Sequence, residues 1–443
     1  MSASKEDKPA PVPARATQAG EVRARWAWTE PSVWTERMLT ALENGVKGGV
    51  WYSLIDKVHR PANLYSAFEQ VKANDGAAGT DRQTIERFEA NLEANLAKLG
   101  VELQTGQYRP GAVRRVWIPK PGKKEKRPLG IPTVRDRIVQ TALRNVVEPI
   151  FEREFAAQSY GFRPNRSTKG ALRRVDELLH AGYVHAVDAD LKQYFDTIPK
   201  VKLMEVLKLK IADGRVLELV EKFLEQAVND NGEEYVPAAG TPQGAVLSPL
   251  LSNLYLNALD HLMERQGYEM VRYADDFVVL CRTQAEAAAA LTELQRWTAQ
   301  AGLTLHPEKT RLVDASLPGG FDFLGYHFER GKHWPSEKSK KKFRDALRPL
   351  TARNNGHSLQ VIIARINPKL RGWFEYFKHS PRIALRAMDG WTRQRLRNIQ
   401  RRRHHRYGIA SGRDQRRWPN AFFAAHGLFS LEAAHVQHCQ SNK

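Results

Sequence analysis

Two adjacent carboxylates interrupt an otherwise apolar stretch, VRYADDFVVLC at residues 271–281. Acids beside a hydrophobic strand are costly to bury unless a cation or hydrogen bonds compensate their charge. The runs on either side, YEMVRY and FVVLCR, are rich in β-branched and aromatic residues, and residues 274–276 separate them. This pattern predicts a β-hairpin that carries Asp275 and Asp276 at its tip.

A second pair of acids ends another predicted strand, YVHAVDADL, at Asp188 and Asp190. Two strand ends that carry acids can meet at one point and bind divalent cations through oxygen ligands. Two metal ions about 3.5–4 Å apart can activate an attacking hydroxyl and stabilise a leaving pyrophosphate. Either acid pair alone is weak support, because a turn with two acids is usually solvated.

The charge balance indicates an anionic partner. The chain has 69 Lys and Arg against 49 Asp and Glu, a formal net charge of +20. Nucleic acid is the first candidate and an anionic membrane the second. No apolar run is as long as a membrane-spanning helix and no apolar signal segment opens the chain, which favours nucleic acid in the cytosol. The two cysteines, Cys281 and Cys439, exclude a disulfide framework or a cysteine-based zinc site. On charge alone, a ribosome-associated protein or RNA chaperone is an equal alternative.

Strands and helices alternate along most of the chain. Helical patterns cover residues 61–73, RDRIVQTALRNVVEPIFE and SPLLSNLYLNALDHLMER, and RRVWIPKPGKKEKRPLGIP is typical of two strands joined by a basic turn. A further helix follows the acidic hairpin, with Thr283 and Glu286 at capping-box spacing and Gly302 as its C-terminal stop. Because one hairpin is antiparallel, we expect an α+β fold.

The composition changes near residues 330–336, where a basic, purely helical region begins. SLQVIIARI and LRGWFEYF each place apolar residues on one helical face, and RQRLRNIQRRRHHRYG is a basic helix-like run. The Pro-, Ala- and Ser-rich start predicts disorder over residues 1–25. We therefore expect an N-terminal region at 26–182, a central domain at 183–332, a helical domain at 333–410 and a short basic segment at 411–443.

Several motifs occur in a fixed order: DADLKQYFD, GTPQGAVLSPLLSN, RYADD, GLTLHPEKT and FDFLGY. The series resembles the palm motifs of reverse transcriptases. IPKPGKKEKRPLGIPTVRDRIVQ and SYGFRPNRST resemble, more narrowly, the group II intron reverse transcriptase/maturase family, and the resemblance covers about residues 60 to 435. It implies a right-hand polymerase, with fingers and palm built on mixed or antiparallel sheet plus helices, followed by an all-α thumb and maturase domain.

The resemblance also implies roles for single residues. Asp190, Asp275 and Asp276 match the catalytic acids, and these acids together with Leu191 match the contacts to two Mg²⁺ ions, for which Mn²⁺ is a substitute. Lys309 matches the residue proposed to protonate departing pyrophosphate. Asp188 precedes the matched position by two residues, so strand alternation points it the same way, but we expect only a supporting role.

Residues around the incoming nucleotide and the primer match in the same way. Lys120 and Arg127 match the triphosphate contacts, Gln243 the nucleotide-facing glutamine, and Phe195 the aromatic residue beneath the sugar, where a ring would clash with a 2′-hydroxyl. Phe323, Leu324 and Gly325 match the loop that grips the primer end. Read without the resemblance, Phe195 is a core residue and FDFLGY is ordinary strand packing.

The basic helical region is the candidate RNA surface. The residues expected to neutralise phosphates are Lys340, Lys341, Lys342, Arg393, Arg397, Arg401, Arg402 and Arg403. A solvated basic surface without a single partner is the alternative. Family members with a homing endonuclease carry a further C-terminal domain with paired cysteines, which we do not expect here.

The leading hypothesis is an RNA-directed DNA polymerase that also binds its group II intron RNA to assist splicing and retrohoming. Its expected partners are an RNA template with a DNA primer, deoxynucleotides, target DNA and, as an oligomer, a second copy of the chain, with no membrane. The expected location is the bacterial cytosol or nucleoid. Two alternatives stay open: a host-adapted reverse transcriptase in DNA repair or phage defence, and a non-catalytic RNA-folding cofactor.

Overall fold

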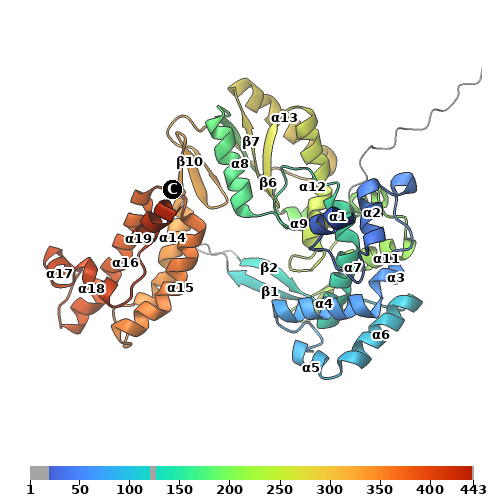
Figure 1. Cartoon of the computed structure of the whole chain (residues 1–443), viewed down its shortest axis with the longest axis horizontal. Helices are drawn as coiled ribbons and strands as arrows, with labels where there is room; N and C mark the ends of the chain where they lie inside the picture. Colours follow the sequence, from blue (N-terminus) through green and yellow to red (C-terminus); the bar gives the residue numbers. More distant parts are fainter. Residues whose placement is uncertain (1–18, 120–125, 442–443) are drawn as a thin grey trace, which may run out of the picture.

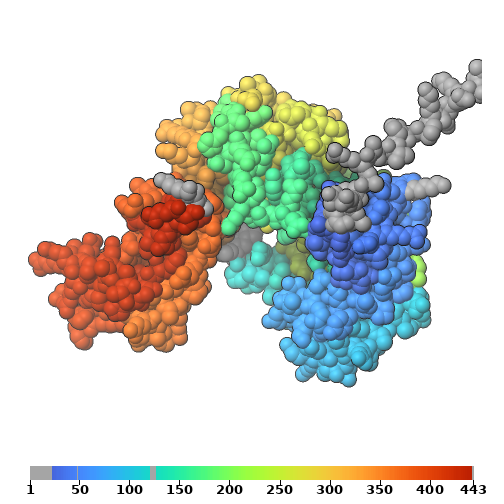
Figure 2. Space-filling view, in the orientation of Figure 1, coloured from blue at the N-terminus to red at the C-terminus, as the bar shows by residue number. Residues whose placement is uncertain are grey.

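The computed structural model describes residues 19–119 and 126–441, whose helices and strands are arranged as an arch (Figure 1). Figure 2 shows a hollow between the N-terminal lobe and the helical lobe, residues 337–441. Within the described residues, we find no helix with the length and apolar character needed to cross a membrane. Lys120 lies outside the described residues.

The N-terminal lobe is mainly helical. Its helices are α1 (Ala19–Arg25), α2 (Glu36–Asn44), α3 (Ile55–Val58), α4 (Pro61–Asn74), α5 (Ile85–Glu89), α6 (Leu92–Thr105) and α7 (Val134–Glu152). The disorder predicted for residues 1–25 is wrong for 19–25, which form α1. Val22 is buried there as part of the main core, which the Ala-rich, charged composition of this segment does not predict. The helix predicted at 61–73 is confirmed as α4.

A four-stranded sheet joins this lobe to the centre of the molecule. Its order is β2-β1-β4-β5, with β1 (Val113–Pro119), β2 (Lys126–Ile131), β4 (Val228–Asp230) and β5 (Glu233–Tyr235). The predicted strands on either side of the basic turn are confirmed as the antiparallel pair β1 and β2. Helix α7 follows, capped by the Thr133 side chain, and 14 of its 19 residues are buried.

The central sheet has the order β6-β7-β3-β8, all antiparallel, with β3 (His185–Asp190), β6 (Glu269–Tyr273), β7 (Asp276–Cys281) and β8 (Arg311–Asp314). The predicted acidic hairpin is confirmed as β6 and β7. Because side chains alternate, Val187 and Ala189 face α12 (Ser248–Arg265) and α13 (Gln284–Ala301), in the core to which Val279 also belongs. Ala186, Val278 and Leu280 pack on the other face, in the cluster that includes residues of α8 (Thr168–His180).

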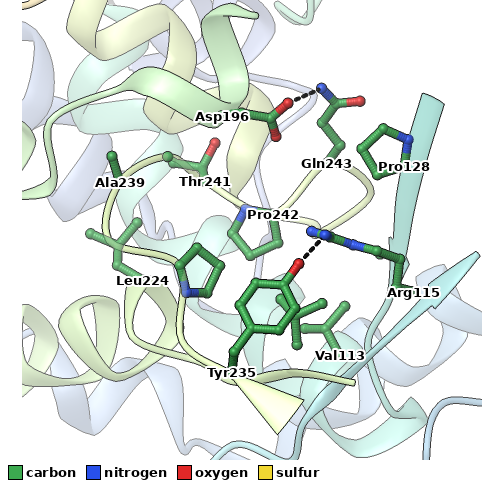
Figure 3. A pocket seen from close by; sticks show the side chains of 14 residues that line it. Val113, Arg115, Pro128, Asp196, Leu224, Tyr235, Ala239, Thr241, Pro242 and Gln243 are labelled. Atoms are coloured by element: carbon green, nitrogen blue, oxygen red, sulfur yellow. Dashed lines mark hydrogen bonds between the residues drawn. The ribbon is translucent and has the colours of Figure 1, made fainter. Parts of the chain in front are cut away.

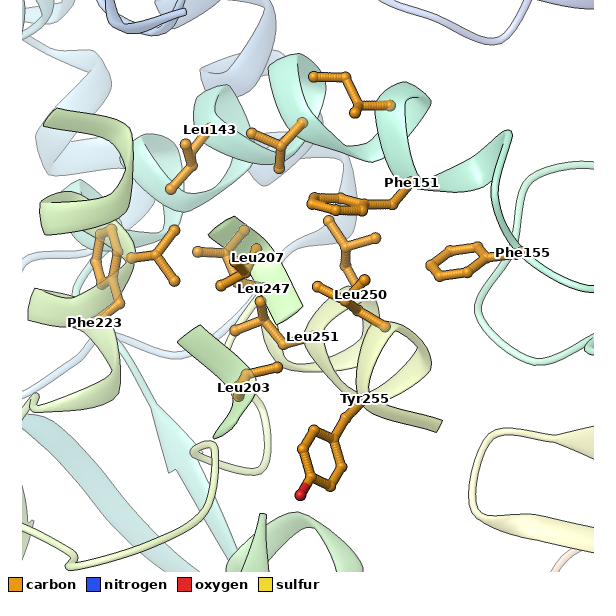
Figure 4. Packing of buried hydrophobic residues seen from close by; sticks show 14 of the residues in the cluster. Leu143, Phe151, Phe155, Leu203, Leu207, Phe223, Leu247, Leu250, Leu251 and Tyr255 are labelled. Atoms are coloured by element: carbon orange, nitrogen blue, oxygen red, sulfur yellow. The ribbon is translucent and has the colours of Figure 1, made fainter. Parts of the chain in front are cut away.

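Short helices complete the central part of the main core: α9 (Tyr194–Thr197), α10 (Lys200–Lys208) and α11 (Gly214–Leu224). Figure 4 shows side chains of α7, α10, α11 and α12 packed together, among them Phe151, Leu207 and Leu250. The predicted boundaries of α12 are confirmed. Helix α13 is confirmed with Thr283 as its N-cap and Gly302 as its left-handed C-cap.

The helical lobe begins after a small sheet of order β11-β10-β9, with β9 (Phe321–Phe323), β10 (Tyr326–Glu329) and β11 (Lys332–Pro335). Its helices are α14 (Glu337–Leu347), α15 (Leu359–Phe377), α16 (Arg382–Arg403), α17 (Gly412–Arg417), α18 (Asn420–Ala425) and α19 (Leu431–Ser441). The two predicted apolar faces form one helix, α15, whose Ile362, Ile366 and Leu370 are fully buried. Residues 411–441 are not a separate basic segment, because Trp418, Phe423 and Leu431 belong to the same core.

Candidate active site

Asp188, Asp190 and Asp276 lie on one face of the central sheet. Asp190 at the end of β3 lies directly opposite Asp276 at the start of β7, and Asp188 lies opposite Val278. Residues opposite one another on antiparallel strands have Cβ atoms about 4.5–5.5 Å apart. Asp275 occupies the turn just before β7, after Ala274 with a φ of +60°. The acids that are far apart in the sequence are therefore neighbours in space.

Negative charge is concentrated here. Crowding by surrounding protein atoms, followed by repulsion from Asp275, Asp188 and Asp190, raises the pKa of Asp276 to about 7, although the residue as a whole is exposed. Burial, and next the charge of Asp190, also raises the pKa of Asp275. These acids therefore repel one another unless a cation lies between them.

Two basic side chains neutralise part of this negative charge. The Lys309 ammonium forms an ion pair with Asp190, and Arg311 donates from Nε to Asp188 at 3.1 Å. The loop that carries Lys309 is fixed to the end of β3, because His306 donates its backbone N–H to the carbonyl of Asp190 at 2.7 Å. Asp188 is thus engaged with Arg311, whereas Asp275 and Asp276 face each other's charge.

The donor set suits a hard divalent cation, since carboxylate oxygens are the ligands that Mg²⁺ takes. Among the residues the structure describes, no three His, Cys, Asp or Glu side chains are already arranged as a closed metal cage. Leu191 has a buried side chain and pairs with Leu305, so only its backbone carbonyl is available as a ligand. The geometry thus offers Asp190, Asp275 and Asp276 as ligands, with the Lys309 ammonium beside the first.

Two of the predicted nucleotide contacts, Phe195 and Gln243, lie at the loop 240–244. Gly240 and Gly244 have φ values of +90° and +102°, and a Cβ on Gly240 would lie 2.6 Å from the carbonyl oxygen of Phe195. The Gln243 carbonyl accepts the backbone N–H of Gly130 at 2.6 Å, which ties the loop to β2. Phe195 is half-buried against the main core, and Arg127 is exposed near the start of β2.

A pocket of about 200 Å³ lies behind this loop (Figure 3). It contains Arg115 hydrogen-bonded to the Tyr235 hydroxyl, and Asp196 accepting the Gln243 amide at 3.5 Å. Burial raises the pKa of Asp196. The side-chain amide of Gln243 therefore points toward Asp196 on the pocket side of the loop.

The predicted primer loop is the turn between β9 and β10. Leu324 and Gly325 both have positive φ, +48° and +83°. Tyr376 of α15 donates its hydroxyl to the Leu324 carbonyl at 2.7 Å, and Ser339 of α14 donates to the Gly325 carbonyl at 2.8 Å. Phe323 is buried. The turn is therefore fastened directly to the helical lobe.

The predicted RNA contacts differ in exposure. Lys341, Lys342, Arg402 and Arg403 are exposed, and Lys340 pairs with Glu337 at the surface. Arg393 and Arg401 are half-buried and pair with Asp389 and Asp414.

Arg397 is a correction to the predicted RNA surface, because it is 6% exposed. It donates to the Trp418 carbonyl at 3.0 Å and to Asn420 at 2.8 Å. Those bonds take its guanidinium away from any phosphate.

The sequence reasoning missed Arg272, which is fully buried beside the acidic turn. It forms a two-point ion pair with Asp260 of α12, at 2.8 and 2.5 Å, and donates to Asn253 at 2.9 Å. The only signal in the sequence is an arginine inside the apolar strand EMVRY, since such a charge is not buried without a partner.

Comparisons with known proteins identify two domains in this chain. A reverse transcriptase (RNA-dependent DNA polymerase) family model matches residues 118–328, and a group II intron maturase-specific domain model matches residues 340–418. Protein YkfC of Escherichia coli strain K12 is 30% identical over 382 residues, which span 77% of this chain and 95% of YkfC. The chain belongs to the group II intron reverse transcriptase/maturase family.

Matches between this reverse transcriptase and its other relatives span a smaller share of the relative's length. The group II intron-encoded protein LtrA of Lactococcus lactis subsp. cremoris is 39% identical over 203 residues, 45% of this chain and 33% of LtrA. Among solved structures, the partial Cas6-RT-Cas1–Cas2 complex is 24% identical with a TM-score of 0.35, covering 56% of this chain and 41% of that chain. At that TM-score the structural likeness supports no argument about function.

Proposed function

We propose that Asp190, Asp275 and Asp276 hold two Mg²⁺ ions, with Mn²⁺ as a substitute, and that this site extends a DNA primer with deoxynucleotides on an RNA template. The observation that carries the proposal is the register that puts Asp190 directly opposite Asp276, with Asp275 next to it in the turn. When bound, the ions supply activation of the primer hydroxyl and neutralisation of the phosphates.

Other residues of the chain bind the incoming nucleotide and select deoxynucleotides over ribonucleotides. The Lys309 ammonium, beside Asp190, holds the proton that departing pyrophosphate receives. Arg127, with Lys120, binds the triphosphate as a fork and a point charge. The Phe195 ring, half-buried on α9, would clash with a 2′-hydroxyl of the bound sugar and so select deoxynucleotides.

We also infer that the helical lobe binds group II intron RNA and assists splicing. The exposed cations Lys341, Lys342, Arg402 and Arg403 support this role, because phosphate neutralisation supplies most of the affinity for nucleic acid. The proposal includes retrohoming into target DNA in the bacterial cytosol or nucleoid. A second copy of the chain is a candidate partner.

Primer extension on an RNA template tests the polymerase site. Asp275→Ala should abolish extension, while the matched change Asp188→Ala should lose less than about tenfold, because Asp188 is an acid of the same strand face that Arg311 already neutralises. Extension by Asp275→Ala at the rate of the unaltered protein would refute the site assignment. Splicing of the intron RNA by Asp275→Ala protein measures the maturase role separately, and loss of splicing in a variant that lacks the exposed cations supports the RNA surface.

A further inference from the structure

The motif SYGFRPN at residues 159–165 lies directly against the acidic turn, residues 273–276, and has no function assigned above. The backbone N–H of Tyr160 donates to the Arg272 carbonyl at 2.8 Å, and the N–H of Arg272 donates to the Gln158 carbonyl at 3.0 Å. Ser159 and Arg272 thus form a parallel bridge. The chain from Gln158 onward therefore runs beside β6 and arrives at the turn.

Arg272 fixes the turn from the opposite side of the sheet to the carboxylates. Its register opposite Phe277 points its side chain toward α12, where Asp260 pairs with it and Asn253 accepts from Nη1. The same Nη1 donates to the carbonyl of Ala274 at 2.8 Å. A fully buried guanidinium with these partners has little freedom, so the turn carbonyl has little freedom as well.

Asn253 links Arg272 to the motif. Its Oδ1 accepts from Arg272 and its Nδ2 donates to the Gly161 carbonyl at 2.7 Å. Gly161 packs so tightly on the turn that an added Cβ would lie 2.8 Å from the carbonyl carbon of Tyr273 and closer still to the nitrogen of Ala274. Only a glycine leaves the turn where it is.

We propose that Arg272, Asp260, Asn253 and Gly161 form a turn brace that sets the position of the Asp275 carboxylate for divalent-cation binding. They are positioning residues, since none faces the hollow. The proposal rests on the proposed function, because it takes Asp275 as a metal ligand. Metal sites require their ligands within about 0.5 Å of the productive geometry, and loss of a supporting contact typically weakens metal binding 10–100-fold.

Gly161→Ala and Gly79→Ala are a matched pair for the test. Gly79 is a somewhat less crowded glycine away from the turn, where an added Cβ would lie 2.7 Å from Cα of Thr133, whereas one on Gly161 would lie closer than this to the nitrogen of Ala274. Mn²⁺ binding is measured by the electron paramagnetic resonance signal of free Mn²⁺, with template, a chain-terminated primer and deoxynucleotide present. We expect Gly161→Ala to weaken Mn²⁺ binding about 10–100-fold and to raise the half-saturating Mg²⁺ for extension similarly, with Gly79→Ala unchanged.

Asn253→Asp is the second variant, and it keeps the test decisive if Gly161→Ala does not fold. Asp has the shape of Asn and still accepts from Arg272, but it replaces the donor to the Gly161 carbonyl by an acceptor. We expect the same direction of change, with KM for deoxynucleotide nearly constant and kcat reduced at low Mg²⁺. Unchanged Mn²⁺ affinity in Asn253→Asp overturns the brace if Asp275→Ala loses that affinity. Full Mn²⁺ affinity in Asp275→Ala would instead refute the metal site itself.

Discussion

Arg397 and the pair Arg402 and Arg403 belong to the same basic helix, α16, yet the structure predicts opposite consequences for their loss. Arg397→Met keeps the apolar stem but removes the donors to the Trp418 carbonyl and to Asn420. A buried acceptor left unsatisfied costs about 1–3 kcal/mol, and the second lost bond adds about 1 kcal/mol. We expect the free energy of unfolding to fall by about 2–4 kcal/mol, with intron RNA affinity unchanged where the protein is folded.

Arg402→Gln with Arg403→Gln should do the reverse. Both side chains are exposed, and Arg403 donates only to exposed carbonyls, those of Asn355 and His357, so stability should change by less than about 1 kcal/mol. Each lost phosphate contact should reduce the slope of log K against log salt by about 0.7–0.9. Urea unfolding and RNA binding across about 50–200 mM salt measure the two effects. A reduced salt slope in Arg397→Met, at full stability, would refute the reasoning.

Three further predictions concern the polymerase site and the N-terminal lobe. Phe195→Ala should lower the preference for deoxynucleotides over ribonucleotides at least tenfold, about 1.4 kcal/mol, in kcat/KM ratios; an unchanged ratio would exclude the ring as the selector. Lys309→Met should lower the single-turnover rate about 10²–10⁴-fold with little change in nucleotide KM, and a change in KM alone would contradict a role as acid. Burial raises the pKa of Glu148 from 4.5 to about 7, so the folded state binds its proton more tightly than the unfolded chain, and this stability is lost as pH rises from about 4.5 to 7. Glu148→Gln should therefore gain up to about 3 kcal/mol over the unaltered protein between pH 5 and pH 8 in urea unfolding, whereas a constant difference would contradict that pKa.

Local pattern was enough to predict the strands and helices that carry the acids. A short sequence pattern is enough to recognise each of them: the apolar run around Asp275, the strand ending at Asp190 and the helix 248–265. The order of the motifs then identified the acids as neighbours in space. The prediction succeeded because the strands that carry the acids belong to one sheet. Side chains alternate between the two faces of a sheet, which determines the residues that share a face.

Partners distant in the sequence were beyond such reasoning. Nothing near Arg397 shows that Trp418 and Asn420 will come to meet its guanidinium, and Arg402, five positions later on the same helix, stays exposed. The burial of Val22 in α1 likewise depends on α2 folding over it. The composition of a segment describes all its residues together, whereas a tertiary contact buries one particular residue among them.

The fastening of the β9–β10 turn has a mechanical consequence. Tyr376 and Ser339 hold the carbonyls of Leu324 and Gly325 from two different helices, α15 and α14. These two hydrogen bonds couple the β9–β10 turn to the helical lobe, so we do not expect the turn to act as a hinge. We therefore expect a tilt of the helical lobe, such as a large RNA bound at its far end would cause, to move this turn together with α14 and α15.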